Sequence, residues 1–355
     1  MPRNWRIQLT VMAAILANYQ IATAHTFCVD NAADLQDALT SASINGPYAN
    51  EDNIIQIVVG TYGTGAATMH QAFTYGSVAQ HSLTILGGYN AGCHARTANA
   101  TATVIDGENQ TGAMALDNLH GDISVEDLTF QHGNTVNSGA GLDINFCSNP
   151  PCAGPQGNRI SVMHSVMRNN TTTSNQCGGG LVAYADALVY VAHNLIEDNT
   201  AGSPAGGGVC LATATGATQF YGNTVVENNA GSGANAAGGL ACGGPAPCEI
   251  YDNIFWDNSG AGLLLTDPGA VLLFNDFGAR VGQDPSIEVG DVSENPQFVD
   301  LAAGNVHLSG ASPLLGLSYI LLNGVDLQGN PYPTGGFQDI GALEETIFVD
   351  GFDAQ

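Results

Sequence analysis

The chain contains no lysine, and its only basic side chains are six arginines. They are outnumbered by 32 acidic residues, which gives a formal net charge of −26. The missing lysine excludes Schiff-base catalysis and the phosphate-binding lysine of a P-loop. Because so acidic a chain repels phosphate backbones and anionic lipid headgroups, we expect no nucleic-acid partner and no polybasic membrane surface.

Charged residues of both signs are scarce as well, at 11% of the chain, where about 25% is usual. Glycine is abundant, at 46 of 355 residues, and 44% of the residues are apolar. A chain with this much apolar material can bury a core, which argues against disorder. The composition therefore indicates an ordered β protein rich in glycine and asparagine.

Long apolar runs are also missing. A short run over residues 9–17 follows Arg3 and Arg6 and precedes a small-x-small motif that ends at Ala24. This arrangement predicts a signal peptide over residues 1–24, because the run is too short for the ~20 residues of a membrane-spanning helix. We therefore expect a mature protein that is secreted or held at the outer cell surface and has no transmembrane helix.

All eight cysteines follow the predicted signal peptide. An even number of cysteines in an exported protein favours disulfide bonds over metal ligands or a catalytic thiol. We predict two disulfides that close short proline-containing loops, and we assign two more from the cysteines that remain. The loop pairs are Cys147–Cys152 and Cys242–Cys248, and the others are Cys28–Cys93 and Cys177–Cys210.

An internal repeat organises most of the chain. Five segments each carry one apolar anchor residue five positions before a second one, and the second anchors are 37, 29, 29 and 30 residues apart. The anchor pairs are Val125/Phe130, Val162/Met167, Val191/Ile196, Phe220/Val225 and Ile250/Phe255. A glycine cluster follows each pair, and each unit holds about three short β runs. A period near 30 residues with such runs predicts a parallel β-helix, in which stacked strands satisfy one another's backbone groups.

The repeat also predicts how the solenoid is held and closed. Asparagines that recur three positions after the second anchor are expected to stack as a side-chain ladder at a corner; they are Asn170, Asn199, Asn228 and Asn258. Residues 34–39 have helical apolar spacing behind an aspartate cap and are expected to form a short helix over the open N-terminal end. We divide the chain into a signal peptide (1–24), a β-helix with its cap (26–285), a C-terminal continuation (286–345) and a tail (346–355).

The repeat resembles the right-handed parallel β-helix, or pectin-lyase-like, superfamily. The segments 295–300, 306–313, 326–329 and 339–344 resemble the choice-of-anchor Q domain, which is associated with secreted or surface-attached β-helix proteins. Residues 347–352 are similar to a tail of exported bacterial proteins, which is either a sorting tag or a segment that packs on the last rung. The superfamily resemblance implies that polysaccharide lyase or glycoside hydrolase activity is an alternative, in which lyases combine Asp-bound Ca²⁺ with a basic residue.

The candidate site residues form columns on successive units. Asp198, Glu227 and Asp257 lie two positions after the second anchors, about 5 Å from one another if the strands stack. Such a column is a solvated face, a calcium site or a catalytic carboxylate pair. Arg168, in the same repeat, is either a base or the ion-pair partner of Glu197.

Other columns suggest histidine pairing and sugar contact. His164 and His193 share a position before the second anchor and are expected to stack, with a metal site possible only if Asp252 joins them. Trp256, with Tyr221 and Tyr251 nearby, offers aromatic surface for a glycan.

We therefore expect a non-catalytic, secreted or surface-associated β-helix that contacts an extracellular polysaccharide or a cell-surface glycan. The alternative is a carbohydrate-active enzyme on the same fold. Calcium is the one candidate cofactor, and the lack of lysine weakens the enzyme alternative because lysine is a usual catalytic base of this fold.

Overall fold

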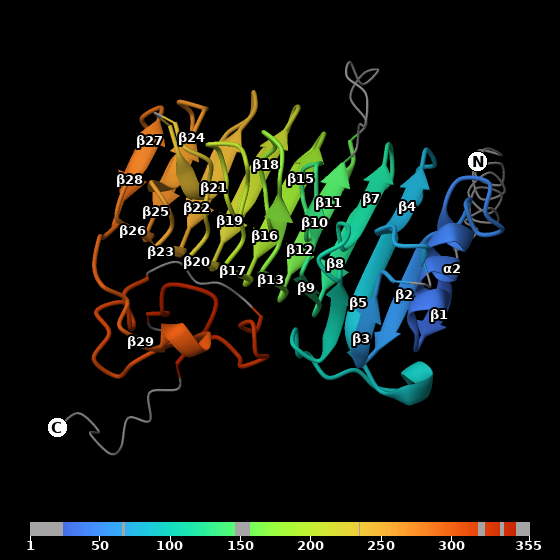
Figure 1. The fold of residues 1–355 in the computed structure, drawn as a ribbon. Coiled ribbons are helices and arrows are strands. Elements are labelled where there is room, and N and C mark those ends of the chain that lie inside the picture. Colours follow the sequence, from blue (N-terminus) through green and yellow to red (C-terminus); the bar gives the residue numbers. More distant parts are fainter. Residues whose placement is uncertain are drawn as a thin grey trace, which may run out of the picture.

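The computed structural model describes residues 24–65, 68–145, 157–233, 235–318, 324–333 and 337–345. Three long sheets, in which all strands run parallel, stack along one axis, and a short helix lies at the N-terminal end (Figure 1). This is the predicted parallel β-helix. The predicted signal peptide, except for Ala24, and the C-terminal tail lie outside the described residues.

Sheet A has ten strands, which are, in spatial order, β1 (His25–Val29), β2 (Asn53–Val58), β5 (Leu83–Tyr89), β8 (Ile123–Glu126), β12 (Arg159–Met163), β16 (Leu188–Ala192), β19 (Ala217–Tyr221), β22 (Cys248–Tyr251), β25 (Val271–Leu273) and β28 (Ile287–Val289). Sheet B has eight strands, β3 (Gly60–Gly63), β6 (Thr103–Asp106), β9 (Thr129–Gln131), β13 (Val166–Arg168), β17 (Leu195–Glu197), β20 (Thr224–Val226), β23 (Ile254–Trp256) and β26 (Asp276–Phe277).

Sheet C also has eight strands, β4 (Phe73–Ser77), β7 (Met114–Asn118), β11 (Leu142–Asn145), β15 (Leu181–Ala185), β18 (Val209–Thr213), β21 (Ala237–Gly243), β24 (Ala261–Leu265) and β27 (Arg280–Gly282). Smaller elements are the strand pairs β10 (Asn134–Thr135) with β14 (Thr171–Thr172) and β29 (Phe298–Asp300) with β30 (Asn305–Leu308), and the 3-10 turns η3 (Ala91–Cys93) and η4 (Leu301–Ala303).

The repeat maps directly onto the rungs of the solenoid. In each unit the first apolar anchor lies in sheet A, the second lies in sheet B, and the glycine cluster leads into sheet C. All ten anchors are buried in one continuous core; in β16 and β17, for example, Val191 and Ile196 have no exposed surface. The unit of sequence is therefore one full turn of the chain.

The helix α2 (Ala32–Ala42) covers the N-terminal end of this core. Leu35 and Leu39 are completely buried and belong to the core cluster. The helix begins earlier than predicted, because Asn31 rather than an aspartate is the N-cap: its side chain accepts the backbone N–H of Asp34 at 3.0 Å. The Asn31 amide in turn donates to the carboxylate of Asp34.

Two asparagine ladders hold the corners between the sheets. The predicted ladder follows sheet B: Oδ1 of Asn199 accepts the backbone N–H of Asn170 (3.1 Å) and its Nδ2 (2.9 Å), and the pattern repeats to Asn228 and Asn258. A second ladder, which the sequence analysis did not identify, follows sheet A and ends on a carboxylate. Its members are Asn194, Asn223, Asn253, Asn275 and Asp291.

Three of the four predicted disulfides are present among the described residues: Cys28–Cys93, Cys177–Cys210 and Cys242–Cys248. The first ties β1 to η3 across 65 residues. The fourth predicted pair, Cys147–Cys152, lies outside the described residues.

The chain leaves the solenoid after β28 and folds back along its side (Figure 1). The described residues of 295–345, here called the C-terminal segment, pack on the outer face of sheet B. Leu195 and Val226 of that face contact an apolar cluster that includes Val306 and Leu343. The segment therefore covers a flank of the solenoid, whereas β28 extends sheet A; the proposed division at residue 286 stays a prediction.

The aspartates of the choice-of-anchor-like motifs act as turn caps. The buried Asp326 accepts the backbone N–H groups of Gln328 and Asn330 through Oδ1, and that of Glu344 through Oδ2. Asp339 likewise accepts the N–H of Gly316 at 2.6 Å. These carboxylates join the separate turns of the C-terminal segment to one another.

The asparagine ladder makes a stability prediction. Replacing Asn199 with Ala leaves the buried backbone N–H of Asn170 without its acceptor, so we expect the free energy of unfolding to fall by about 2–3 kcal/mol. Chemical denaturation followed by circular dichroism measures this loss. Asn229→Ala is the control, because Asn229 is exposed and directly follows the ladder residue Asn228 on the next rung. Equal loss in the two variants would contradict a stabilising role for the ladder.

Candidate functional site

The predicted column of acids lies at the corner between sheets B and C. Asp198 and Asp257 are exposed and Glu227 is half-buried. Each directly follows a strand of sheet B, and those strands are paired in register. Burial raises the pKa of Glu227, and the neighbouring Asp198 and Asp257 raise it further. The three carboxylates are therefore close enough to influence one another, as predicted.

These residues also share a backbone conformation that explains why they recur. Asp198, Glu227 and Asp257 have φ between 52° and 56°, in the left-handed region. Outside glycine, this region is occupied mostly by Asn, Asp and His. The chain must turn sharply just before each ladder asparagine, so Asp198 and Asp257 have a conformational reason to be there, which the glutamate at position 227 does not share.

The column of acids is also the candidate calcium site. Among the described residues, no group of three or more His, Cys, Asp or Glu side chains is placed to hold a metal ion. Asp198 and Asp257 are open to water, whereas Ca²⁺ is usually held by six to eight oxygen ligands. Calcium binding by the column therefore stays a prediction.

Arg168 lies on the outer face of sheet B. Its Nε donates to Oε1 of Gln131 on the preceding rung at 3.1 Å. Glu197 is its neighbour in register on β17, and its carboxyl group is buried. Burial raises the pKa of Glu197 to about 7, although the charge of Arg168 opposes this shift. Arg168 is thus held against sheet B and next to an acid that tends to stay protonated.

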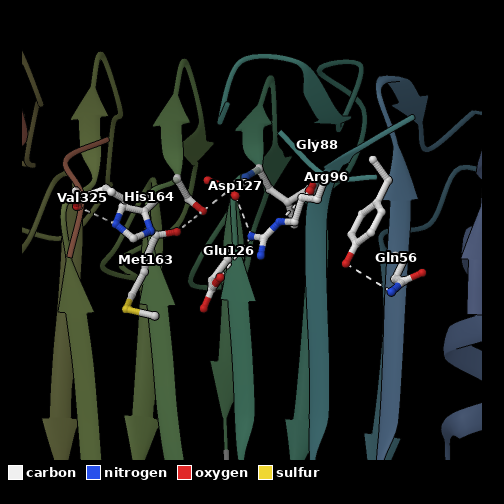
Figure 2. A network of polar contacts seen from close by, with 12 residues as sticks. Gln56, Gly88, Arg96, Glu126, Asp127, Met163, His164 and Val325 are labelled. Carbon is white, nitrogen blue, oxygen red and sulfur yellow. Dashed lines mark hydrogen bonds and ion pairs between the residues drawn. The ribbon is translucent and has the colours of Figure 1, made fainter. Parts of the chain in front are cut away.

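The histidine column lies at the other corner, between sheets A and B, beneath the C-terminal segment. The rings of His164 and His193 stack with 5.4 Å between centroids, as predicted. Nε2 of His164 lies 3.0 Å from the carbonyl oxygen of Val325, and Nδ1 of His193 lies 2.7 Å from the hydroxyl of Tyr332 (Figure 2 shows the His164 contact). Both imidazoles therefore secure the C-terminal segment to the solenoid.

Asp252 continues the same column and is completely buried. Burial raises its pKa to about 7, and the nearby carboxylates of Asp291 and Glu344 add to the effect. The backbone carbonyl of Asp252 accepts the N–H of Gly341 from the C-terminal segment. Among the described residues, Asp252 forms no metal-binding group with the two histidines. It lies buried where the C-terminal segment contacts the solenoid.

An aromatic strip runs along the outer face of sheet A. Tyr190, Tyr221 and Tyr251 come from the consecutive strands β16, β19 and β22, and all three are half-buried. The rings of Tyr221 and Tyr251 are stacked, with 4.7 Å between centroids and an angle of 6°. Tyr190 meets Tyr221 edge-on at 5.8 Å. We call these three residues the tyrosine strip.

Polar groups fix Tyr221, the central ring of the tyrosine strip. The hydroxyl of Tyr221 donates to Oε2 of Glu249 at 2.5 Å, and the amide of Gln219 donates to the same oxygen at 2.8 Å. Burial raises the pKa of all three tyrosines, so their phenol groups stay protonated at physiological pH. Trp256, in contrast, lies on sheet B and packs against the C-terminal segment, away from the strip.

One strongly perturbed acid was not among the predicted site residues. Asp143, on the outer face of sheet C, is partly buried, which raises its pKa to about 7, and the carboxylate of Asp117 on the adjacent strand raises it further. The amide of Asn145 donates to Oδ1 of Asp143 at 2.6 Å. The acid alternates with buried residues in Leu142–Asn145, and this period-two pattern was the available signal that it faces outward.

Comparison with models of known protein families, with curated proteins and with solved structures finds no match. Across the described residues, no helix combines the length and apolar character needed to cross a membrane. The candidate sites therefore have to be judged on their geometry.

Buried carboxyl groups make the stability of the protein depend on pH. Asp252 and Glu344 have pKa values raised to about 7, mainly by burial. Such a group stabilises the folded chain fully at low pH and loses this contribution as the pH rises from about 4 to about 7. Further carboxyl groups raised to between about 6 and 7 are Asp143, Glu197, Asp276 and Asp291.

His193 acts in the opposite direction, because burial lowers its pKa to about 3 and its contribution grows as the pH rises from about 3 to 6.5. Since the raised carboxyl groups outnumber it, we expect the melting temperature to fall from pH 5 to pH 8. Asp252→Asn should weaken this pH dependence, whereas the exposed control Asp37→Asn, on the N-terminal helix, should keep it. A melting temperature that rises over this range would contradict the assignment.

Proposed function

We propose that this protein is a secreted or surface-associated, non-catalytic β-helix of the pectin-lyase-like kind, which contacts an extracellular polysaccharide or a cell-surface glycan. The tyrosine strip is the observation that carries the proposal. Its rings lie on successive rungs, so they form an elongated surface parallel to the solenoid axis. Aromatic rings offer apolar surface to the C–H faces of sugars, and the phenol and carboxylate groups beside them can bond to hydroxyls.

Export is supported by the predicted signal peptide and by three disulfides, which persist mainly in oxidising compartments. The non-catalytic part of the proposal is supported by the placement of the predicted catalytic candidates. The acids of the column lie on exposed corners, and Arg168 lies on a different face from the tyrosine strip. The choice-of-anchor resemblance is consistent with surface attachment.

The alternative function, a carbohydrate-active enzyme, is favoured by Asp143. A protonated carboxyl group and a second carboxylate on an adjacent strand are the pair that an acid–base mechanism uses. In this alternative Asp143 is the general acid and Asp117 the base, and no group of the predicted acid column takes part.

Binding to insoluble polysaccharides tests the proposal. The protein without residues 1–24 is mixed with neutral and uronic-acid polymers, and bound protein and released sugar ends are measured together. We expect binding without turnover. Tyr251→Ala should weaken binding at least tenfold, because removing the ring loses roughly 1.5–3 kcal/mol of apolar contact with the sugar. Tyr48→Ala, near the N-terminal helix, is the matched control and should bind normally.

Two outcomes would contradict the proposal. One is unchanged binding of Tyr251→Ala. The other is release of reducing or unsaturated ends that disappears in Asp143→Asn, which would establish the enzyme instead.

A further inference from the structure

A second candidate site lies on a different face of the solenoid from the tyrosine strip. A groove of about 620 Å³ separates the loop that follows η3 from the C-terminal segment, and its floor is the outer face of sheet B. Val166 and Leu195 supply that floor, and Leu343 continues it onto the C-terminal segment. This volume is in the range of roughly 300–1,000 Å³ that is typical of small-molecule sites.

The first wall of the groove is fixed by Arg96 (Figure 2). Its Nη2 contacts the carboxylates of Asp127 at 2.6 Å and Glu126 at 3.0 Å, and its Nε donates to the carbonyl of Gly87. The next residue, Thr97, donates its backbone N–H to Gly88. The bonds of Arg96 and Thr97 thus fix the start of the loop of residues 97–101, which lines the groove.

The second wall is fixed by bonds within the C-terminal segment and to the solenoid. The backbone N–H of Leu327 donates to the carbonyl of Ala342, and the carbonyl of Val325 lies against His164. Oε1 of Glu345 accepts from Nδ1 of His307 and from the N–H of Leu308, both at 2.9 Å. Both walls are therefore built before a ligand arrives, as in most small-molecule sites.

The charge of the groove selects against ions. None of the described residues that line it is Asp, Glu, Arg or Lys, and His307 is its one titratable side chain. An anion would find His307 as the one basic side chain of the lining, already bonded to Glu345, and would meet the field of a chain with net charge −26. A cation would find no carboxylate on the lining. A charged ligand would have to lose its hydration shell without compensation, so the groove suits an uncharged one.

The rim of the groove carries amide side chains that use only some of their hydrogen-bonding atoms within the protein. Asn99 Oδ1 accepts from Thr101, and Asn305 Oδ1 accepts from the N–H of His307, which leaves both Nδ2 groups as donors. Gln328 donates through Nε2 to Nε2 of His307, which leaves its Oε1 as an acceptor. The rim therefore offers two amide donors and an amide acceptor above an aliphatic floor.

We propose that this groove binds a small, uncharged, hydroxylated molecule with one apolar face, of the class of neutral mono- and disaccharides. The hydroxyls would bond to Asn99, Asn305 and Gln328, and the C–H face would lie on Val166 and Leu195. The groove is separate from the tyrosine strip, so this proposal holds or fails independently of polymer binding.

Isothermal titration and saturation-transfer NMR test the site with a defined panel: glucose, galactose, mannose, xylose, rhamnose, their β-linked disaccharides, galacturonic acid and glucosamine. We expect at least one neutral sugar to bind with a Kd below about 1 mM and the two charged sugars to bind at least tenfold more weakly. Gln328→Ala should weaken binding about tenfold through one lost hydrogen bond. The exposed Gln110→Ala, outside the groove, should bind normally.

Ala98→Trp is a second variant, at a position whose side chain makes none of the hydrogen bonds that fix the two walls. Ala98 is exposed on the rim, so the larger ring would fill the groove without disturbing the core. We expect loss of binding with an unchanged melting temperature. The proposal is overturned if no neutral sugar binds, if the charged sugars bind equally well, or if Ala98→Trp binds like the wild type. If only the proposal for the tyrosine strip is wrong, the polysaccharide assay will show no polymer binding, whereas the titration with small sugars will still show binding.

Discussion

Each turn of this solenoid bends the chain sharply between sheets A and B and again between B and C, and the backbone N–H groups at these bends lie inside the protein. Ladder asparagines satisfy them: Asn223 accepts the N–H of Asn194 from the rung before, and its own N–H is accepted by Asn253. The residue before each ladder position has positive φ. Each corner therefore consists of a residue in the left-handed conformation followed by a buried asparagine. The strands between the corners place the apolar anchors in the core.

This corner geometry explains the columns of acids and histidines. Left-handed positions favour Asn, Asp, His and Gly, so these residue types recur at one position on successive rungs without needing a shared chemical role. The exposure and the pKa of each such residue depend on whether the C-terminal segment covers it. Asp198 and Asp257 remain in water, whereas Asp252 and His193 are covered by the C-terminal segment and acquire strongly shifted pKa values. The surfaces that we propose for recognition are the tyrosine strip, whose central ring Tyr221 is bonded to Glu249, and the groove.

The sequence was sufficient for the fold because the repeat encodes it locally: the anchors, glycine clusters and ladder asparagines each act within one turn of the chain. It also placed Asp198, Glu227 and Asp257 in one column and His164 beside His193. It did not predict that the C-terminal segment covers sheet B, because the contact between His164 and Val325 joins residues 161 positions apart. The groove depends on that same long-range packing, and Tyr190 was missed because it stands two residues earlier in its strand than Tyr221 does.

We propose that the acids at the corners serve the turn of the backbone, whereas the tyrosine strip and the groove bind ligands. The most direct measurement is glycan binding by the triple variant Asp198→Asn, Glu227→Gln and Asp257→Asn, compared with the wild type with and without Ca²⁺. Asn occupies left-handed positions readily and Gln keeps the shape of the glutamate it replaces, so the variant should fold. We expect glycan binding equal to that of the wild type and independent of Ca²⁺. Loss of binding in a folded triple variant would contradict this proposal. So would wild-type binding that requires Ca²⁺ when binding by the variant does not.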